Sequence, residues 1–332
     1  MAPSTNTRTR SILLSAIAAA ATVSLTATGC SGASSTKPNT NVASTPTSAS
    51  TASGANSAAD TSVPAAETAS MVTADSNADF AATIDALKAA VSSNGMMILG
   101  ELDQAAALKA TGLNLAGAHT FFVGNPSMGK MFFQMNPAIG TVVPLRILVW
   151  AGEDGKAHVS YFDPKPAFAA VDPKLAEGGQ KMSDAAAMLT KAATGGAIGH
   201  PSAPQALTLK TVDAKGSFDD AINAVKSSAS ANGMMVLGEL DQAGALKATG
   251  LNLAGAHTFF VGNPSMGKMF FQMNPAIGTV VPLALFIWAG DDGKTHVSYF
   301  DPAPMFAAVD PKLANGGQKM SQAAAMVAGS VA

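Results

Sequence analysis

Histidine and methionine side chains recur at matching positions in two halves of this sequence, and they are the residues best suited to bind a metal or haem. Imidazole and thioether groups are preferred ligands of Cu(I) and haem iron. The first set is His119, Met128, Met131 and Met135, and the second is His257, Met266, Met269 and Met273. Methionines at helical spacing are also ordinary core fillers. We favour that interpretation and predict no cofactor, with copper or haem as the alternative.

Two asparagine-proline pairs indicate helix starts that can attract anions. Asn125 precedes Pro126, with Lys130 one turn later, and Asn263 and Lys268 occupy the matching positions in the second set. Helix N-termini bind anions through free N–H groups and the helix dipole. The alternative is plain capping by the asparagine side chain. We favour capping and retain both pairs as anion-site candidates.

Hydrolase and nucleic-acid-binding functions find no support in the sequence. Ser127 lies in Asn-Pro-Ser-Met-Gly, which lacks the first glycine of a nucleophile elbow, so no catalytic residue is predicted. The net charge is −2 and charged residues make up 13% of the chain. Binding to nucleic acid requires a clustered basic face, and none is evident.

A long internal repeat organises the chain. Residues 95–145 recur as residues 233–283, except that Val236 replaces Ile98 and Gly244 replaces Ala106. A repeat this long indicates a duplicated domain, because solenoid units have periods of roughly 20–50 residues. We therefore predict one domain over residues 66–194, a linker over 195–203 and a second domain over 204–332.

Each repeat predicts alternating strands and helices. In the first, Phe80, Ile84, Leu87 and Val91 form one apolar stripe of a helix that ends at Asn94-Gly95. Asp-Gly between two apolar runs predicts a hairpin. We expect strands at 71–73, 96–102, 118–123, 145–151 and 157–162. We expect helices at 104–109 and 180–192, and one that begins at Pro126 and is ended by Pro137 and Gly140. This order predicts an α+β fold with a mainly antiparallel sheet covered by helices.

The N-terminus predicts export and lipid anchoring. Arg8 and Arg10 precede an apolar run that ends at Gly29-Cys30, which is typical of a lipoprotein signal peptide over residues 1–29. Cys30 is the only cysteine in the chain, so it is the predicted lipidation site. An ordinary signal peptide with an incidental cysteine is the alternative. Residues 30–65 are rich in Ser, Thr, Ala and Pro, which predicts a disordered tether. We expect an exported, membrane-anchored protein of the cell envelope whose partner is the membrane.

A longer set of motifs resembles the DUF302 family. It comprises Gly124-Asn125-Pro126-x-x-Gly129, Gln134, Asn136-Pro137, Pro144-Leu145, Asp154-Gly155-Lys156 and Ser160-Tyr161-Phe162-Asp163-Pro164, and it recurs in residues 262–302. The resemblance implies a domain of the TATA-binding-protein-like type. It also implies that the two repeats can pack as an internal pseudo-dimer, because single-domain members are seen as dimers. It supplies no catalytic residues, so we expect a non-catalytic binding or envelope-associated role.

The chain departs from that family pattern at two places. Many members carry Asp-His where this chain has Asp103-Gln104 and Asp241-Gln242. Many also carry Asp-Leu-Pro where it has Val-Val-Pro at 142–144 and 280–282. A site built from those polar residues in relatives would be weakened here.

Overall fold

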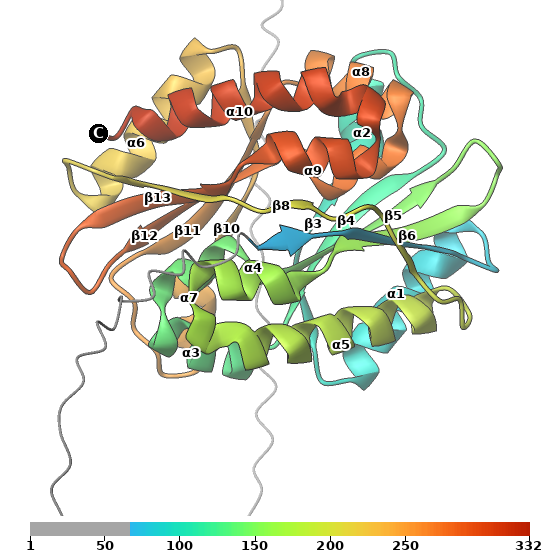
Figure 1. Cartoon of the computed structure of the whole chain (residues 1–332), viewed down its shortest axis with the longest axis horizontal. Helices are drawn as coiled ribbons and strands as arrows, with labels where there is room; N and C mark the ends of the chain where they lie inside the picture. Colours follow the sequence, from blue (N-terminus) through green and yellow to red (C-terminus); the bar gives the residue numbers. More distant parts are fainter. Residues whose placement is uncertain (1–66) are drawn as a thin grey trace, which may run out of the picture. The chain divides into compact units, whose positions relative to one another are not determined.

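Two antiparallel sheets, one from each repeat, form the framework of the protein (Figure 1). The structure is a computed structural model that describes residues 67–332, so the predicted signal peptide, Cys30 and the predicted tether lie outside the described residues. Within residues 67–332, no helix combines the length and the apolar character needed to cross a bilayer.

The sheet of the first repeat has six strands in the order β3-β4-β5-β6-β2-β7, and all neighbours are antiparallel. The edge strand β7 comes from the predicted linker and pairs with β2. The strands span Met71–Asp75 (β2), Met97–Asp103 (β3), Ala118–Gly124 (β4), Leu145–Ala151 (β5), Ala157–Phe162 (β6) and His200–Pro201 (β7).

The sheet of the second repeat follows the same order with five strands, β10-β11-β12-β13-β9. Its register matches the first sheet residue for residue: His119 pairs with Asp103, and His257 pairs with Asp241. The strands span Leu209–Asp213 (β9), Met235–Asp241 (β10), Ala256–Gly262 (β11), Leu283–Ala289 (β12) and Thr295–Phe300 (β13).

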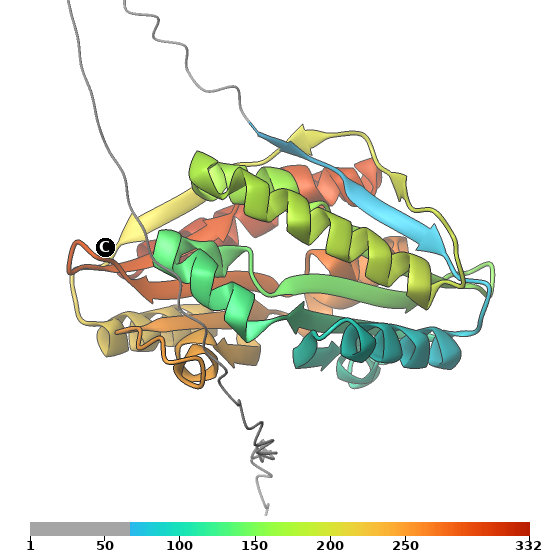
Figure 2. The same cartoon turned by 90° about the horizontal axis from the view of Figure 1, so that it is seen from below.

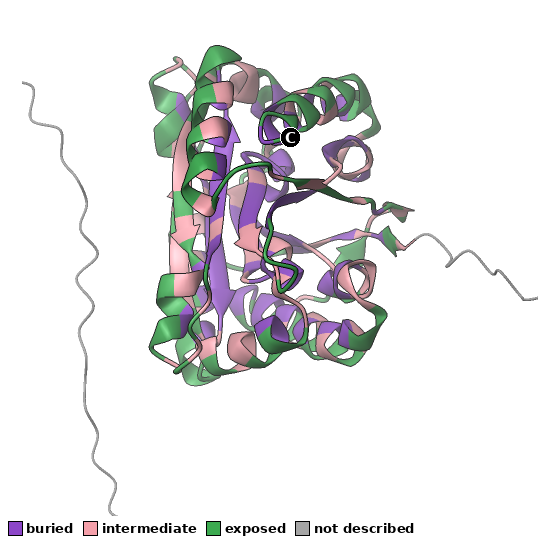
Figure 3. Cartoon of the chain, turned by 90° about the vertical axis from the view of Figure 1, so that its left-hand side faces the viewer, coloured by how far each residue is buried: buried purple, intermediate pink, exposed green. Residues whose placement is uncertain are grey.

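Helices cover the outer face of each sheet, and the buried residues follow the strands and the inner sides of the helices (Figure 3). The first repeat has α1 (Phe80–Ser93), α2 (Gln104–Lys109), α3 (Pro126–Met135), η1 (Pro137–Thr141), α4 (Pro164–Val171), η2 (Pro173–Leu175) and α5 (Ala176–Ala193). The second has α6 (Phe218–Ala231), α7 (Gln242–Lys247), α8 (Pro264–Met273), η3 (Pro275–Thr279), α9 (Pro302–Val309), η4 (Pro311–Leu313) and α10 (Ala314–Gly329).

Local capping explains several helix boundaries and confirms the sequence-based ones. Asn125 caps α3 by accepting from Ser127 N and Met128 N, with Pro126 at the first helical position. Ser217 and Asp220 form a reciprocal capping box at the start of α6. Gly95 follows α1 with φ of 65°, a conformation that costs glycine little.

The inner faces of the two sheets pack against the opposite repeat (Figure 2). Phe122 of β4 stacks on its counterpart Phe260 of β11, with ring centroids 4.5 Å apart. The short helix η1 packs on β11, β12 and β13, and η3 packs on β4, β5 and β6. Side chains alternate between faces along a strand, so Phe121 packs into its own repeat while Phe122 meets the other one.

Each repeat also contributes to the core of the other. Leu108 of α2 and Ala118 belong to the core of the second repeat, whereas Leu246 of α7 and Phe286 of β12 belong to the core of the first. A two-stranded sheet of β1 (Thr68–Ala69) and β8 (Gln205–Ala206) adds a further connection. The described repeats therefore share buried surface extensively.

The predicted α+β class with a mainly antiparallel sheet and helical cover is confirmed. Two helical boundaries differ from the sequence-based ones. Helix α4 was not predicted, because Pro164 and Pro166 argue against a helix interior; both lie in its first turn, where proline is tolerated. Helix α5 begins at Ala176 rather than Gln180 because residues 176–179 already follow the turn made by η2.

Candidate functional site

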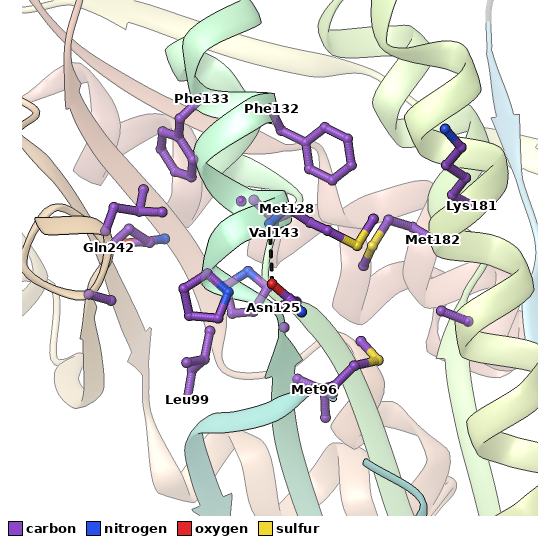
Figure 4. Close-up of a pocket in the computed structure, with 18 of the residues that line it drawn as sticks. Met96, Leu99, Asn125, Met128, Phe132, Phe133, Val143, Lys181, Met182 and Gln242 are labelled. Carbon is purple, nitrogen blue, oxygen red and sulfur yellow. Dashed lines mark hydrogen bonds between the residues drawn. The ribbon is translucent and has the colours of Figure 1, made fainter. Parts of the chain in front are cut away.

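An apolar pocket of about 240 Å³ lies where the first repeat meets helix α7 of the second (Figure 4). Strands β3 and β4 supply Leu99 and Val123, α3 supplies Met128 and Phe132, and α5 supplies Met182. Met96 precedes β3 and also lines the pocket. We call this cavity the larger pocket; its remaining lining includes Asn94, Asn125, Phe133, Val143, Lys181, Met188, Gln242, Ala245 and Leu246.

Methionine contributes an unusual share of this lining. Met96, Met128 and Met182 project toward the same space, as Figure 4 shows, and the partly exposed Met188 of α5 also lines the pocket. Their thioethers are flexible and polarisable, so the wall can adapt to ligands of different shape. The larger pocket is therefore suited to an apolar molecule rather than to a highly charged one.

Most polar groups at the larger pocket are already engaged within the protein. Asn125 caps α3 and donates from Nδ2 to Gly95 O at 2.9 Å. Lys181 pairs with Glu177 at 2.8 Å. Gln242 donates from Nε2 to Thr258 Oγ1 at 2.6 Å. Its Oε1 is buried and has no hydrogen-bond partner among the described residues. Among the lining residues that the structure describes, it is the one buried side-chain acceptor without a partner.

The matching residues of the second repeat form a smaller pocket of about 60 Å³, closed by α2 of the first repeat. Each residue that lines it has an identical counterpart in the larger pocket, so composition does not explain the difference in volume. The neighbouring methionines differ: Met234 is buried, whereas its counterpart Met96 is only partly buried. The N–H of Met96 donates to Val91 O and that of Met234 to Ala229 O, so the residue at this backbone contact is smaller in the second repeat.

The predicted histidine candidates lie on the strands rather than in these pockets. His119 stacks on Phe121 with centroids 4.6 Å apart, and its Nε2 is 3.1 Å from Glu101 Oε2. His257 stacks on Phe259 in the same way, 3.7 Å from Glu239, and burial lowers its pKa below the usual 6.5. Within residues 67–332, no group of three or more His, Cys, Asp or Glu side chains is placed to hold a metal ion.

The predicted methionine candidates separate into two groups. Met128 and Met266 point inward and line the larger and smaller pockets. Met131, Met135, Met269 and Met273 are exposed, with Met131 at 61% and Met135 at 52%, and line neither pocket. The interpretation of these four methionines as core fillers is therefore wrong, because they are exposed. The fold also does not bring each predicted His and Met set together.

The predicted anion-binding residues have structural partners. Asn125 and Asn263 satisfy the first N–H groups of α3 and α8 with their own side chains. Lys130 donates to Thr249 O and Lys268 to Thr111 O, each at 3.0 Å and each across the repeat boundary. These contacts agree with capping and with repeat packing.

Sequence reasoning did not identify most of the larger pocket. Leu99, Met182 and Gln242 come from β3, α5 and α7, which are brought together only by packing of the two repeats. One usable signal was present: Gln104 and Gln242 are the positions at which the chain departs from the Asp-His of many DUF302 members. Both glutamines lie in the boundary between repeats, where each also donates to a carbonyl of the other repeat, Gly278 O and Gly140 O respectively.

Comparison with known proteins gives a family but no activity. Three curated proteins named fluoride-specific ion channels are 33% identical over 94 residues: FluC 1 of Brucella suis, FluC 1 of Brucella abortus and FluC 2 of Brucella melitensis. That region is 28% of this chain, and it spans only 35–37% of those relatives. A crystal structure of an uncharacterised conserved DUF302 protein from Bacillus stearothermophilus is 20% identical, with a TM-score of 0.35, covering 37% of this chain and 98% of that one.

The family model described as "Domain of unknown function DUF302" matches two separate regions, residues 72–194 and residues 210–329. These regions contain all the strands of the two sheets except β7, and both α3 and α8 that line the pockets. The chain therefore belongs to the DUF302 family and carries two copies of its domain in tandem.

Proposed function

We propose that this protein is exported, anchored to a membrane through lipid on Cys30, and binds a small apolar molecule in the larger pocket without transforming it. The observation that carries the binding role is the larger pocket itself, about 240 Å³ of space walled by thioether, aliphatic and aromatic side chains. Ligand pockets are usually concave and mostly apolar, with a few polar groups that orient the ligand.

The chemistry of the lining defines the ligand class. Burying apolar surface contributes about 25 cal/mol per Å², so a compact apolar body gains most of its affinity from these walls. The unpaired Oε1 of Gln242 can accept one hydrogen bond. A buried acceptor without a partner is costly, so a ligand with one N–H or O–H donor is favoured over a hydrocarbon of the same shape.

Both repeats line the larger pocket and both line the smaller one, so equivalent residues of the two pockets provide a matched pair of variants that tests the binding role. Ala245 of α7 lines the larger pocket, and its counterpart Ala107 of α2 lines the smaller one; both alanines are exposed. We expect Ala245→Trp to obstruct the larger pocket and Ala107→Trp to leave it open. The probe is N-phenyl-1-naphthylamine, a neutral fluorophore with one N–H donor whose emission rises in apolar surroundings.

Fluorescence titration of the purified protein should show one binding site per chain in the wild type and in Ala107→Trp. Ala245→Trp should lower the affinity by at least about tenfold, which corresponds to roughly 1.4 kcal/mol. Absence of binding in the wild type, or equal affinity in the two tryptophan variants, would reject the larger pocket as the site.

The anchor rests on the sequence around Cys30 and is tested separately. Several acyl chains provide stable attachment, because each buried CH₂ contributes about 0.8 kcal/mol. The wild type should be labelled by a radioactive fatty acid and recovered with membranes. Cys30→Ser should lose the label and leave the membrane fraction, whereas unchanged fractionation would contradict lipid anchoring.

A second candidate function follows from the four methionines at the larger pocket. Thioethers are soft ligands that suit Cu(I), and Met96, Met128, Met182 and Met188 line one space. This set replaces the His119-containing set that the sequence suggested. Metal analysis of protein purified without added metal distinguishes the candidates, since stoichiometric copper or haem would favour the second.

A further inference from the structure

Arg146 of β5 reaches from the first repeat into the second. Its Nη1 donates to Val280 O and Pro282 O, both at 3.1 Å. Its Nη2 donates to Gly278 O at 2.9 Å and to Val281 O at 2.6 Å. A guanidinium has five N–H donors, of which four belong to the two Nη atoms. These four contacts therefore use every donor of the guanidinium except the one on Nε.

Within residues 67–332, Arg146 has no carboxylate partner; its guanidinium faces carbonyl oxygens and lies 5.9 Å from the centroid of the Phe122 ring. Nε is buried and makes no hydrogen bond within residues 67–332. None of the ion pairs in this part of the chain involves Arg146. Burial lowers the pKa of the guanidinium to about 9, so it still carries its charge at pH 7. A buried charge without a counter-ion is costly, and an incoming anion would remove that cost.

A second cavity adjoins this arginine. It measures about 140 Å³ and lies between the repeats; we call it the Arg146 cavity. Its walls are largely aliphatic and aromatic and come from both repeats, including Val142, Leu145, Phe162, Val280, Leu283 and Phe300. Ala284, the counterpart of Arg146 in the second repeat, lines the same cavity, and its small side chain contributes to the open space.

Asp163 is the other charged residue in the lining, and it restricts the charge of a ligand. Its carboxylate caps α4 by accepting from Lys165 N at 3.1 Å, and it also accepts from Ser183 Oγ. The hydrogen bonds of this carboxylate are therefore made within the first repeat, and none is made to Arg146. Its negative charge disfavours a dianion in the cavity, because like charges repel strongly at low dielectric.

We propose that the Arg146 cavity binds a small monocarboxylate, with the carboxylate beside the guanidinium of Arg146 and a short apolar body held between side chains of both repeats. The volume is close to the ~150 Å³ of a cavity that accommodates benzene, which limits the enclosed body to about six carbons. Because Ala284 replaces the arginine in the second repeat, one such site exists per chain. The site is distinct from the larger pocket and does not depend on the function proposed for it.

Calorimetric titration of Ala245→Trp with hexanoate, 1-hexanol and hexylamine tests this proposal directly. The larger pocket is obstructed in that variant, so 1-hexanol, which carries the O–H donor favoured there, reports only on the Arg146 cavity. The three probes share an apolar body and differ in charge. Hexanoate should bind with one site per chain and at least about tenfold more tightly than 1-hexanol, because the charge of the guanidinium attracts only the carboxylate. Hexylamine should bind more weakly than either. Equal affinities for hexanoate and 1-hexanol, or no hexanoate binding, would overturn the proposal.

Two variants locate the binding. Ala284→Leu fills the cavity while keeping Arg146, and it should weaken hexanoate at least about tenfold. Arg146→Met should remove the preference for hexanoate over 1-hexanol. If Arg146→Met does not fold, Ala284→Leu still decides, because unchanged hexanoate affinity in that variant would place the site elsewhere. Ala245→Trp, which alters only the larger pocket, should leave hexanoate binding unchanged.

Discussion

Gly140 lies at a very close approach between the two repeats, and its replacement tests how strongly they depend on each other. A methyl group at Gly140 would lie within 2.7 Å of three ring atoms of Phe286, which belongs to the second repeat but is buried in the core of the first. That ring is 1% exposed and has little room to move. Overpacking a dense core costs about 1–3 kcal/mol. We expect Gly140→Ala to lower the free energy of unfolding by about 3 kcal/mol.

Two further glycine-to-alanine variants, at Gly278 and Gly129, provide comparisons for the loss of stability expected at Gly140. At Gly278, the counterpart in the second repeat, the new methyl group would lie 2.9 Å from the end of the Leu148 side chain, which is more flexible than a ring. Gly278→Ala should cost about 1 kcal/mol. At Gly129 in α3 the nearest atom is 3.4 Å away, in Leu246. Gly129→Ala should be neutral or stabilising by up to about 0.5–1 kcal/mol, because alanine is the better helix former.

Urea denaturation followed by tryptophan fluorescence measures these effects in each repeat separately. Trp150 lies in the first repeat and Trp288 in the second, and the chain has no other tryptophan. With one tryptophan replaced by phenylalanine at a time, Gly140→Ala should shift both signals to the same lower urea concentration. A shift confined to Trp150 would show that the repeats do not unfold together, and no shift in either signal would contradict the predicted overpacking at Gly140.

Three further effects follow from single contacts. Ser217→Ala removes the hydroxyl that accepts from Asp220 N, so urea denaturation should show a loss of about 1 kcal/mol. A double-mutant cycle at Phe122 and Phe260 should give a coupling of about 0.5–1.5 kcal/mol, whereas additive losses would exclude a favourable stack. Burial lowers the pKa of His257, so the unfolded state takes up its proton first as the pH falls below 6.5. Stability should fall in that range, and His257→Gln should reduce the decline in a urea-denaturation pH series.

The elements of each repeat were predictable because their boundaries depend on local chemistry. Asn125-Pro126 sets the start of α3, and Gly95 permits the turn after α1. Helix α4 was harder to predict, since Pro164 and Pro166 argue against a helix unless both are known to lie in its first turn. Proline is informative about a helix only once the position of the N-terminus is known.

The packing of the two repeats against each other was harder to predict from the sequence than the helices and strands within each repeat. Strand β4 carries buried side chains on both faces, so each face must pack against another part of the protein. The sequence does not show which part packs on which face. Phe121 contacts the core of its own repeat and Phe122 contacts the other repeat, yet the two residues are identical and adjacent in sequence. Only the three-dimensional register separates their roles.

The site was partly within reach of the sequence. Met128 and Asn125 were among the predicted candidates, but their partners Met182 and Gln242 come from elements distant in the chain. Arg146 has no equivalent in the second repeat, which has Ala284 at that position. That asymmetry allows one buried cation and one open cavity to occur together in the boundary between repeats. Searching repeats for shared residues overlooks sites that arise where the copies differ.

Methyl NMR of methionine-labelled protein tests the central claim, that the larger pocket binds apolar ligands, most directly. Addition of N-phenyl-1-naphthylamine should shift the methyl signals of Met96, Met128, Met182 and Met188, which line the larger pocket. Exposed Met131 and Met135, and Met266 and Met320 in the smaller pocket, should change little. Shifts concentrated at the exposed methionines, or equal shifts in the two repeats, would contradict the claim.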